Sequence, residues 1–145
     1  MNVEKLVIHH SASAKSTTTV EDIEKWHRDK GFNGIGYHKV IETNGVLKLG
    51  RPEERMGAHA KGANKNSLGI CVTGNFENEE PDEEQIETLV ETLSDWCKSH
   101  NVDENSIYGH FEVPGCVTTT ACPGNNLKSK LDDIRIQVKG VLAND

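Results

Sequence analysis

Short apolar runs alternate with amphipathic segments along this chain, and this alternation constrains the fold more than any other feature. The runs at residues 3–9, 35–42, 46–49 and 68–73 predict strands, and residues 106–108 predict a last short one. Asn-Gly at positions 44 and 45 is typical of a tight hairpin turn. Strands that alternate with helices indicate an α/β domain, with a central mixed sheet flanked by about three α-helices.

Three segments have apolar residues at helical spacing. The first begins at residues 18–22 (TTVED), which resemble a capping box, and ends at Gly31, because glycine tolerates the left-handed conformation that closes a helix. The second begins at Pro81, followed by three acidic residues that the helix dipole favours. The third covers residues 127–141. In the first helix we expect Trp26 to be a core residue.

The composition excludes several classes of protein. A chain of 145 residues is long enough for one domain with a real core, and a net charge of -7 argues against non-specific binding to nucleic acid. No apolar run approaches the roughly 18 residues that a membrane span needs, and the first run is too short for a signal peptide. The four cysteines are expected to be reduced thiols.

The segment from Tyr108 to Gly124 gathers the residues best suited to chemistry. It places His110 and two thiols, Cys116 and Cys122, in a loop rich in glycine, proline and threonine. Zinc prefers thiolate and imidazole ligands; three protein ligands leave a position for water, whereas a fourth would close the site.

His9, where the first strand meets a polar loop, is a further candidate, although a lone histidine there is more often structural. His10 should point to the opposite face of the strand. Spacing alone leaves metal binding and a structural role equally open.

An ordered set of motifs resolves this ambiguity. The chain resembles the zinc-dependent N-acetylmuramoyl-L-alanine amidases of type 2, which include short phage amidase-lysozymes and peptidoglycan recognition proteins. The resemblance spans nearly the whole chain and rests on VIHHSA (7–12), WH (26–27), GIGYH (34–38), NG (44–45), GR (50–51), HA (59–60), Asn64, NSLGI (66–70), Gly74, GH (109–110) and ACPG (121–124). It implies one catalytic domain over residues 1–145, without a separate cell-wall-binding domain.

The resemblance implies a reaction and its residues. The reaction is hydrolysis of the amide bond between N-acetylmuramic acid and L-alanine in peptidoglycan. One Zn²⁺ per chain would be held by His9, His110 and Cys122, and Tyr37 and Thr120 would be the catalytic residues beside it. Tyr37 would orient the attacking water or donate a hydrogen bond to the developing oxyanion.

Two further residues, His59 and Asn64, would contact the substrate. The main departure from the family pattern is that His110 and Cys122 are twelve residues apart, about four more than in the short forms. This leaves open whether Thr120 or a neighbouring threonine is catalytic, and it places Cys116 near the metal.

Alternatives remain for several residues. Without the resemblance, Tyr37 is better explained as a half-buried strand residue and His27 as a packing residue. Arg51 could pair with a substrate carboxylate or be a surface charge, and nothing fixes the direction of Glu112.

Two other functions stay open: a non-catalytic peptidoglycan-binding module, and a structural zinc domain closed by Cys116. The presence of Cys122 favours an enzyme. Its partner would be peptidoglycan, without nucleic acid or membrane. We expect a monomeric phage or prophage endolysin, without a signal peptide, which stays in the host cytoplasm until lysis.

Overall fold

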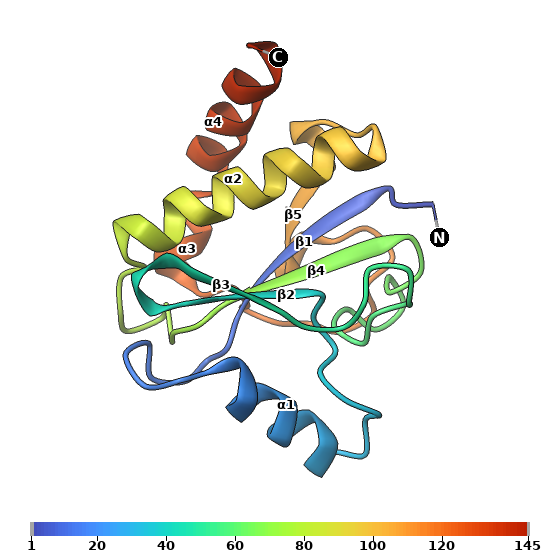
Figure 1. The fold of residues 1–145 in the computed structure, drawn as a ribbon, viewed down its shortest axis with the longest axis vertical. Helices are drawn as coiled ribbons and strands as arrows, with labels where there is room; N and C mark the ends of the chain where they lie inside the picture. The colour runs from blue at the N-terminus through green and yellow to red at the C-terminus, as the bar shows by residue number, and fades with distance from the viewer. Residues whose placement is uncertain (1, 145) are drawn as a thin grey trace.

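A five-stranded mixed sheet forms the centre of the molecule (Figure 1). The computed structural model describes residues 2–144. The strands are β1 (Lys5–His10), β2 (Lys39–Glu42), β3 (Val46–Leu49), β4 (Ser67–Val72) and β5 (Ile107–Gly109). Their order is β3-β2-β4-β1-β5; only β2 and β3 are antiparallel, and they are joined by the predicted Asn-Gly turn. The predicted mixed sheet is therefore confirmed.

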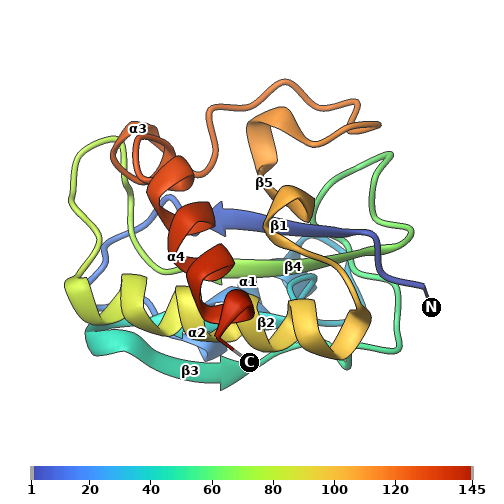
Figure 2. The same cartoon turned by 90° about the horizontal axis from the view of Figure 1, so that it is seen from above.

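Helices cover both faces of this sheet. α1 (Val20–Asp29) lies on one face, and α2 (Glu83–His100) and α4 (Leu131–Ala143) lie on the other (Figures 1 and 2). The predicted C-terminal helix is divided, because the chain turns after the short α3 (Asn125–Lys128) before α4 begins. Within the described residues, no helix combines the length and apolar character needed to cross a membrane.

Side chains alternate between the two faces of β1, and this alternation positions the functional site. Leu6 and Ile8 belong to the main core, which α2 and α4 cover. Val7 packs in a second, smaller cluster on the opposite face, and His9 points to that face as well. His10 lies on the main-core side, where its Nδ1 accepts the backbone N–H of Phe76, as the strand period predicted.

Two local expectations were wrong because tertiary contacts decide them. β2 begins at Lys39 and not at residue 35, because Gly36 instead contacts a neighbouring loop, where its carbonyl accepts the N–H of Ala58. Trp26 is 40% exposed and is not a core residue. Ile23 and His27 form the buried stripe of α1 in its place, four residues apart on one side of the helix.

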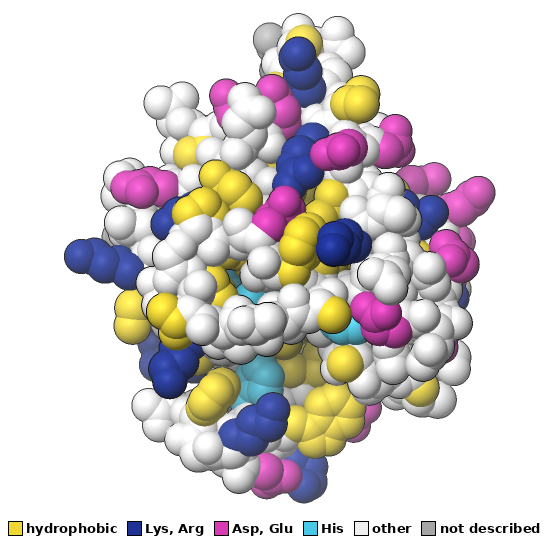
Figure 3. Space-filling view, turned by 180° about the vertical axis from the view of Figure 1, so that it is seen from behind, with side chains coloured by type: hydrophobic (Ala, Val, Ile, Leu, Met, Phe, Trp, Pro, Cys, Tyr) yellow, Lys and Arg dark blue, Asp and Glu magenta, His cyan; other side chains and the backbone are white. Residues whose placement is uncertain are grey.

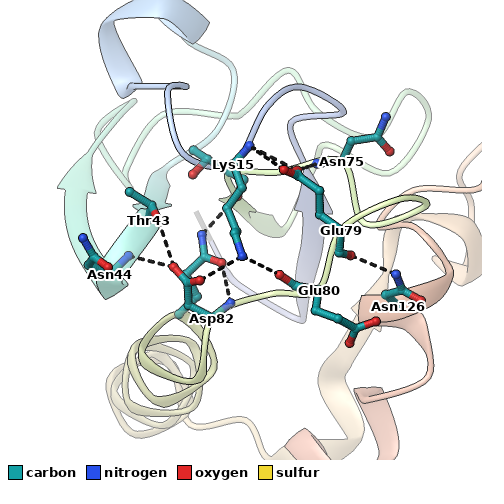
Figure 4. Close-up of polar contacts among 10 residues, drawn as sticks. Lys15, Thr43, Asn44, Asn75, Glu79, Glu80, Asp82 and Asn126 are labelled. Carbon is teal, nitrogen blue, oxygen red and sulfur yellow. Dashed lines mark hydrogen bonds and ion pairs between the residues drawn. The ribbon is translucent and has the colours of Figure 1, made fainter.

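A polar network fixes the loops at the carboxyl ends of the parallel strands (Figure 4). Lys15, in the loop after β1, pairs with Asp82 at 2.9 Å, and its Nζ also donates to the carbonyl of Glu80. Asp82 accepts hydrogen bonds from Thr43 and from the backbone N–H of Asn44 in the β2–β3 turn. The loops that follow β1, β2 and β4 are thereby held together at one edge of the sheet.

Candidate metal centre

Two histidines lie side by side where neighbouring parallel strands end. β1 and β5 pair in a register that places Ile8 opposite Gly109. His9 follows Ile8 within β1, His110 follows Gly109 directly after β5, and their ring centroids are 4.5 Å apart. Strand pairing therefore brings together two imidazoles that are far apart in the sequence.

Cys122 joins these histidines through two backbone interactions. The loop after β5 returns to its starting point, where the N–H of Phe111 donates to the carbonyl of Cys122 at 3.0 Å. The backbone N–H of His10 donates to Cys122 Sγ at 3.3 Å. Donor atoms of His9, His110 and Cys122 all lie within 4.8 Å of one another, so the lengthened loop does not displace the thiol.

The three residues fit a zinc ion. Nδ1 of His9 lies 3.7 Å from Sγ of Cys122, and two such ligands of one tetrahedral zinc are separated by about 3.5 Å. Nε2 of His110 is buried without a hydrogen-bond partner among the described residues, which is a need that a metal ion can satisfy. Two imidazoles and one thiolate leave a fourth position for water or substrate.

Burial tunes the protonation of all three groups. Burial, followed by the neighbouring His59 and His110, holds the pKa of His9 well below its ordinary value, and burial also lowers the pKa of His110. Both rings are therefore neutral near pH 7, the form in which a histidine binds a metal. Burial raises the pKa of Cys122 to about 12, with a partial offset from the N–H of His10. Metal binding at this thiol must therefore release a proton.

Cys116 lies outside this group of donors. It is partly buried against the apolar cluster that contains Val7 and Val113, and its Sγ lies 3.9 Å from the carbonyl oxygen of Thr118. The geometry therefore favours three donors over a closed site with four. All four cysteines are free thiols, in line with the expectation from sequence.

A cleft of about 600 Å³ opens beside the donors. His110, Tyr37 and His59 line it, together with the lysines at positions 30 and 61. Figure 3 shows histidine side chains at the bottom of a hollow on this face. None of the described residues that line the cleft carries a carboxylate, although the whole chain has a net charge of -7.

Tyr37 packs against the first histidine. Its ring centroid lies 4.9 Å from that of His9, and the residue precedes β2 at the wall of the cleft. Burial, followed by the thiols of Cys71 and Cys122, raises the pKa of Tyr37 well above its ordinary value. The phenol therefore keeps its proton near neutral pH and can act as a hydrogen-bond donor.

Two threonines of the loop take different positions. Thr120 accepts the backbone N–H of Cys122 through Oγ1 at 3.1 Å, which leaves its own hydroxyl hydrogen free to donate. Thr118 lines the cleft. Its segment packs on the neighbouring loop, where the N–H of Val117 donates to the carbonyl of Lys61, so the additional residues of the loop build a wall of the cleft.

His59 and Asn64 also line the cleft, and both have internal partners. Asn64 Oδ1 accepts the backbone N–H groups of His59 and Ala60. Nδ1 of His59 lies 2.9 Å from Nε2 of His9, a contact that the sequence did not predict because no spacing rule links the two residues. Burial lowers the pKa of His59 to about 3.

Other candidates are occupied elsewhere. The carboxylate of Glu112 accepts the N–H of Gly109 and pairs with Arg135 at 2.7 Å. Arg51 donates to backbone carbonyls and so fastens the loop after β3. His27 accepts the N–H of Gly36 and lines the cleft, but it is not among the converging donors.

Comparison with known proteins gives the class of protein that this fold and site define. The model of the N-acetylmuramoyl-L-alanine amidase family matches residues 1–125. The chain therefore belongs to this amidase family.

Both phage and animal proteins are similar to it. The endolysin of Enterobacteria phage T3 is 38% identical over 76 residues, which cover 52% of this chain and 50% of the endolysin. The chain thus spans about half the length of that relative. Peptidoglycan-recognition protein SC2 of Drosophila melanogaster is 33% identical over 133 residues, which cover 86% of this chain and 70% of that protein.

Solved structures confirm the fold. The N-acetylmuramoyl-L-alanine amidase LysC from Clostridium intestinale superposes with a TM-score of 0.78 at 32% identity, covering 90% of this chain and 86% of LysC. Bumblebee PGRP-SA gives a TM-score of 0.80 at 27% identity, covering 92% and 82% of the two chains. The expected amidase and peptidoglycan recognition protein fold is thus confirmed.

Proposed function

We propose that this chain hydrolyses the amide bond between N-acetylmuramic acid and L-alanine in peptidoglycan, with one Zn²⁺ held by His9, His110 and Cys122. The observation that carries the proposal is the convergence of these three donors, within 4.8 Å of one another, beside an open cleft. Membership of the amidase family supports the same reaction.

The chain's own residues would divide the chemistry. A bound zinc ion lowers the pKa of water and polarises a carbonyl group. Tyr37, as a neutral phenol beside His9, would donate a hydrogen bond to the substrate oxygen that gains charge, a contribution of about 2 to 4 kcal/mol. Thr120, with its hydroxyl hydrogen free, would donate a second.

The charge of the cleft suits the stem peptide, whose carboxylates are negative. Lys30 and Lys61 line the cleft without any carboxylate beside them among the described lining residues. These ammonium groups would attract and orient the peptide part of the substrate. His59 and Asn64 line the same cleft. They would contact the substrate through the parts of their side chains that face the cleft and that internal hydrogen bonds do not occupy.

The relatives support a proposal for the biological setting. Several are phage endolysins, so we propose that this chain is a monomeric phage or prophage lysis enzyme, kept in the host cytoplasm until it reaches the cell wall. Other relatives are peptidoglycan recognition proteins, so recognition without cleavage is the competing function. The complete set of three donors favours cleavage.

A digest of purified peptidoglycan, read by mass spectrometry, tests the proposal. We expect stem peptides with a free L-alanine amino group, loss of this product after treatment with a chelator, and its return with added Zn²⁺. Binding to peptidoglycan without any released peptide would support the recognition function and contradict the enzyme. Release of sugar fragments alone would contradict the bond assignment.

A further inference from the structure

His59 contacts the proposed ligand His9 through the ring nitrogen that does not face Cys122. Nδ1 of His9 faces Cys122 Sγ, whereas Nε2 of the same ring lies 2.9 Å from Nδ1 of His59. The two rings meet edge to face, with centroids 4.9 Å apart. The second nitrogen of His59 lies 3.3 Å from Oγ of Ser67.

These contacts determine where each proton lies in the series of hydrogen bonds that runs from His9 through His59 and Ser67. A histidine that offers Nδ1 to a metal carries its proton on Nε2, so His9 donates to Nδ1 of His59. His59 must then carry its own proton on Nε2, and it donates to Oγ of Ser67. Ser67 in turn donates its hydroxyl hydrogen to the carbonyl oxygen of Ala63 at 2.7 Å. The series ends on a backbone acceptor, so one arrangement of protons satisfies all its members.

Two glycines leave the space that the ring of His59 occupies. A Cβ added at Gly69 would lie 2.6 Å from Cγ of His59, and one added at Gly57 would lie 2.6 Å from its Cδ2. Asn64 fixes the backbone of His59 by accepting its N–H through the side-chain oxygen. The surrounding chain therefore holds the imidazole in one place and one orientation.

We propose that His59 is a positioning residue for the metal ligand His9, whose tautomer and ring orientation it fixes through the hydrogen bond from Nε2. The inference rests on the proposed zinc site and gives His59 a role that substrate contact alone does not require. Outer partners of this kind typically change metal affinity by about 10- to 100-fold when removed.

The test measures the zinc affinity of the metal-free protein by competition with a chromogenic chelator. We expect His59→Ala to weaken zinc binding by about 10- to 100-fold. His59→Asn should restore most of the affinity, because asparagine Oδ1 takes the place of Nδ1 and accepts the same proton from His9. Thermal unfolding of each metal-free variant reports on folding separately.

His38 offers a matched control. It is a buried histidine that packs against His59, but among the described residues its ring nitrogens have other partners: Nδ1 accepts the N–H of Gly69, and Nε2 lies at the carbonyl of Arg55. His38→Asn should lower the melting temperature and leave zinc affinity within about twofold.

The outcomes separate this inference from the proposed function. Zinc affinity unchanged in His59→Ala would overturn the positioning role alone, as would a His59→Asn variant no better than the alanine. A wild-type protein that binds no zinc would overturn the proposed metal site and this inference with it. Tight zinc binding without amidase activity would contradict only the reaction.

Discussion

The backbone N–H of His10 donates a hydrogen bond to the sulfur of Cys122 at 3.3 Å. The strand that carries the first proposed ligand thus also holds the third, across an interval of 112 residues. Backbone N–H groups directed at a sulfur stabilise its thiolate form. The end of β1 therefore helps to fix the position of this thiol.

We expect Cys122→Ser to weaken zinc binding by more than about 100-fold and to remove amidase activity to a similar extent, because a hydroxyl is a poor substitute for a thiolate ligand. Chelator competition and peptide release measure the two effects. Cys116→Ser is the control, and it should stay within about twofold of the wild type, since that thiol packs in an apolar cluster. Equal losses in both variants would contradict the ligand assignment.

Tyr37→Phe should lower kcat by about 100- to 1,000-fold, because it removes a donor to the oxygen that gains charge in the transition state. Zinc affinity should not change, since the ring that packs on His9 remains. Steady-state kinetics with a soluble muramyl peptide, together with chelator competition, check both statements. A variant that keeps its kcat would assign Tyr37 to packing.

The two threonines should differ in the kinetic constant that they affect. Thr120→Val removes a hydroxyl next to Cys122 and should lower kcat by about 10- to 100-fold. Thr118→Val alters the cleft wall and should mainly raise KM. Measurement of kcat and KM for both variants decides which threonine takes part in the reaction; the reverse pattern would move the catalytic role to Thr118.

Lys61→Ala should raise KM by about 2- to 5-fold without changing kcat, in keeping with exposed ion pairs worth up to about 1 kcal/mol. The effect should shrink at high salt, because screening weakens the wild-type attraction. Lys139→Ala, an exposed change on α4, is the control for net charge. A similar rise of KM in both variants would show a general effect of charge.

The metal-free protein should lose stability as the pH falls below about 6.5. Burial lowers the pKa of six histidines in the folded state, namely His9, His10, His27, His38, His59 and His110. Below pH 6.5 the unfolded chain takes up protons that the folded chain does not, so the free energy of unfolding decreases with falling pH.

For His59 alone, whose pKa is about 3, the loss at pH 5 is about 2 kcal/mol. Chemical unfolding at a series of pH values between about 7 and 5 measures the total loss of unfolding free energy from all six histidines. His38→Asn should reduce the slope, because it removes one titrating group. A free energy of unfolding that stays constant over this range would contradict the burial of these rings in their neutral form.

Local sequence patterns predicted most helices and strands well, because interactions between nearby residues determine where these elements begin and end. Thr19 caps α1 and exchanges hydrogen bonds with Asp22, and Gly31 takes the positive φ expected after the helix. The start of β2 and the exposure of Trp26 were missed, since both depend on how a segment meets a distant one.

At the candidate metal centre, too, sequence patterns predicted some features, and tertiary packing decided the others. The order of motifs predicted His9, His110 and Cys122 as metal ligands, and the structure brings the three side chains together. The hydrogen bond from His9 to His59 and the cleft wall beside Thr118 come from side-chain packing between loops, which sequence spacing does not encode.

The proposed ligands His9 and Cys122 are 113 residues apart in the sequence, and this separation has a consequence for folding. An ion bound by both β1 and the loop after β5 would close a loop of more than a hundred residues. It would therefore act as a reversible cross-link. It would bind the folded chain and not the unfolded one, and would therefore stabilise the fold by mass action. During synthesis, the growing chain could acquire the ion only after the loop that carries Cys122 had emerged and docked.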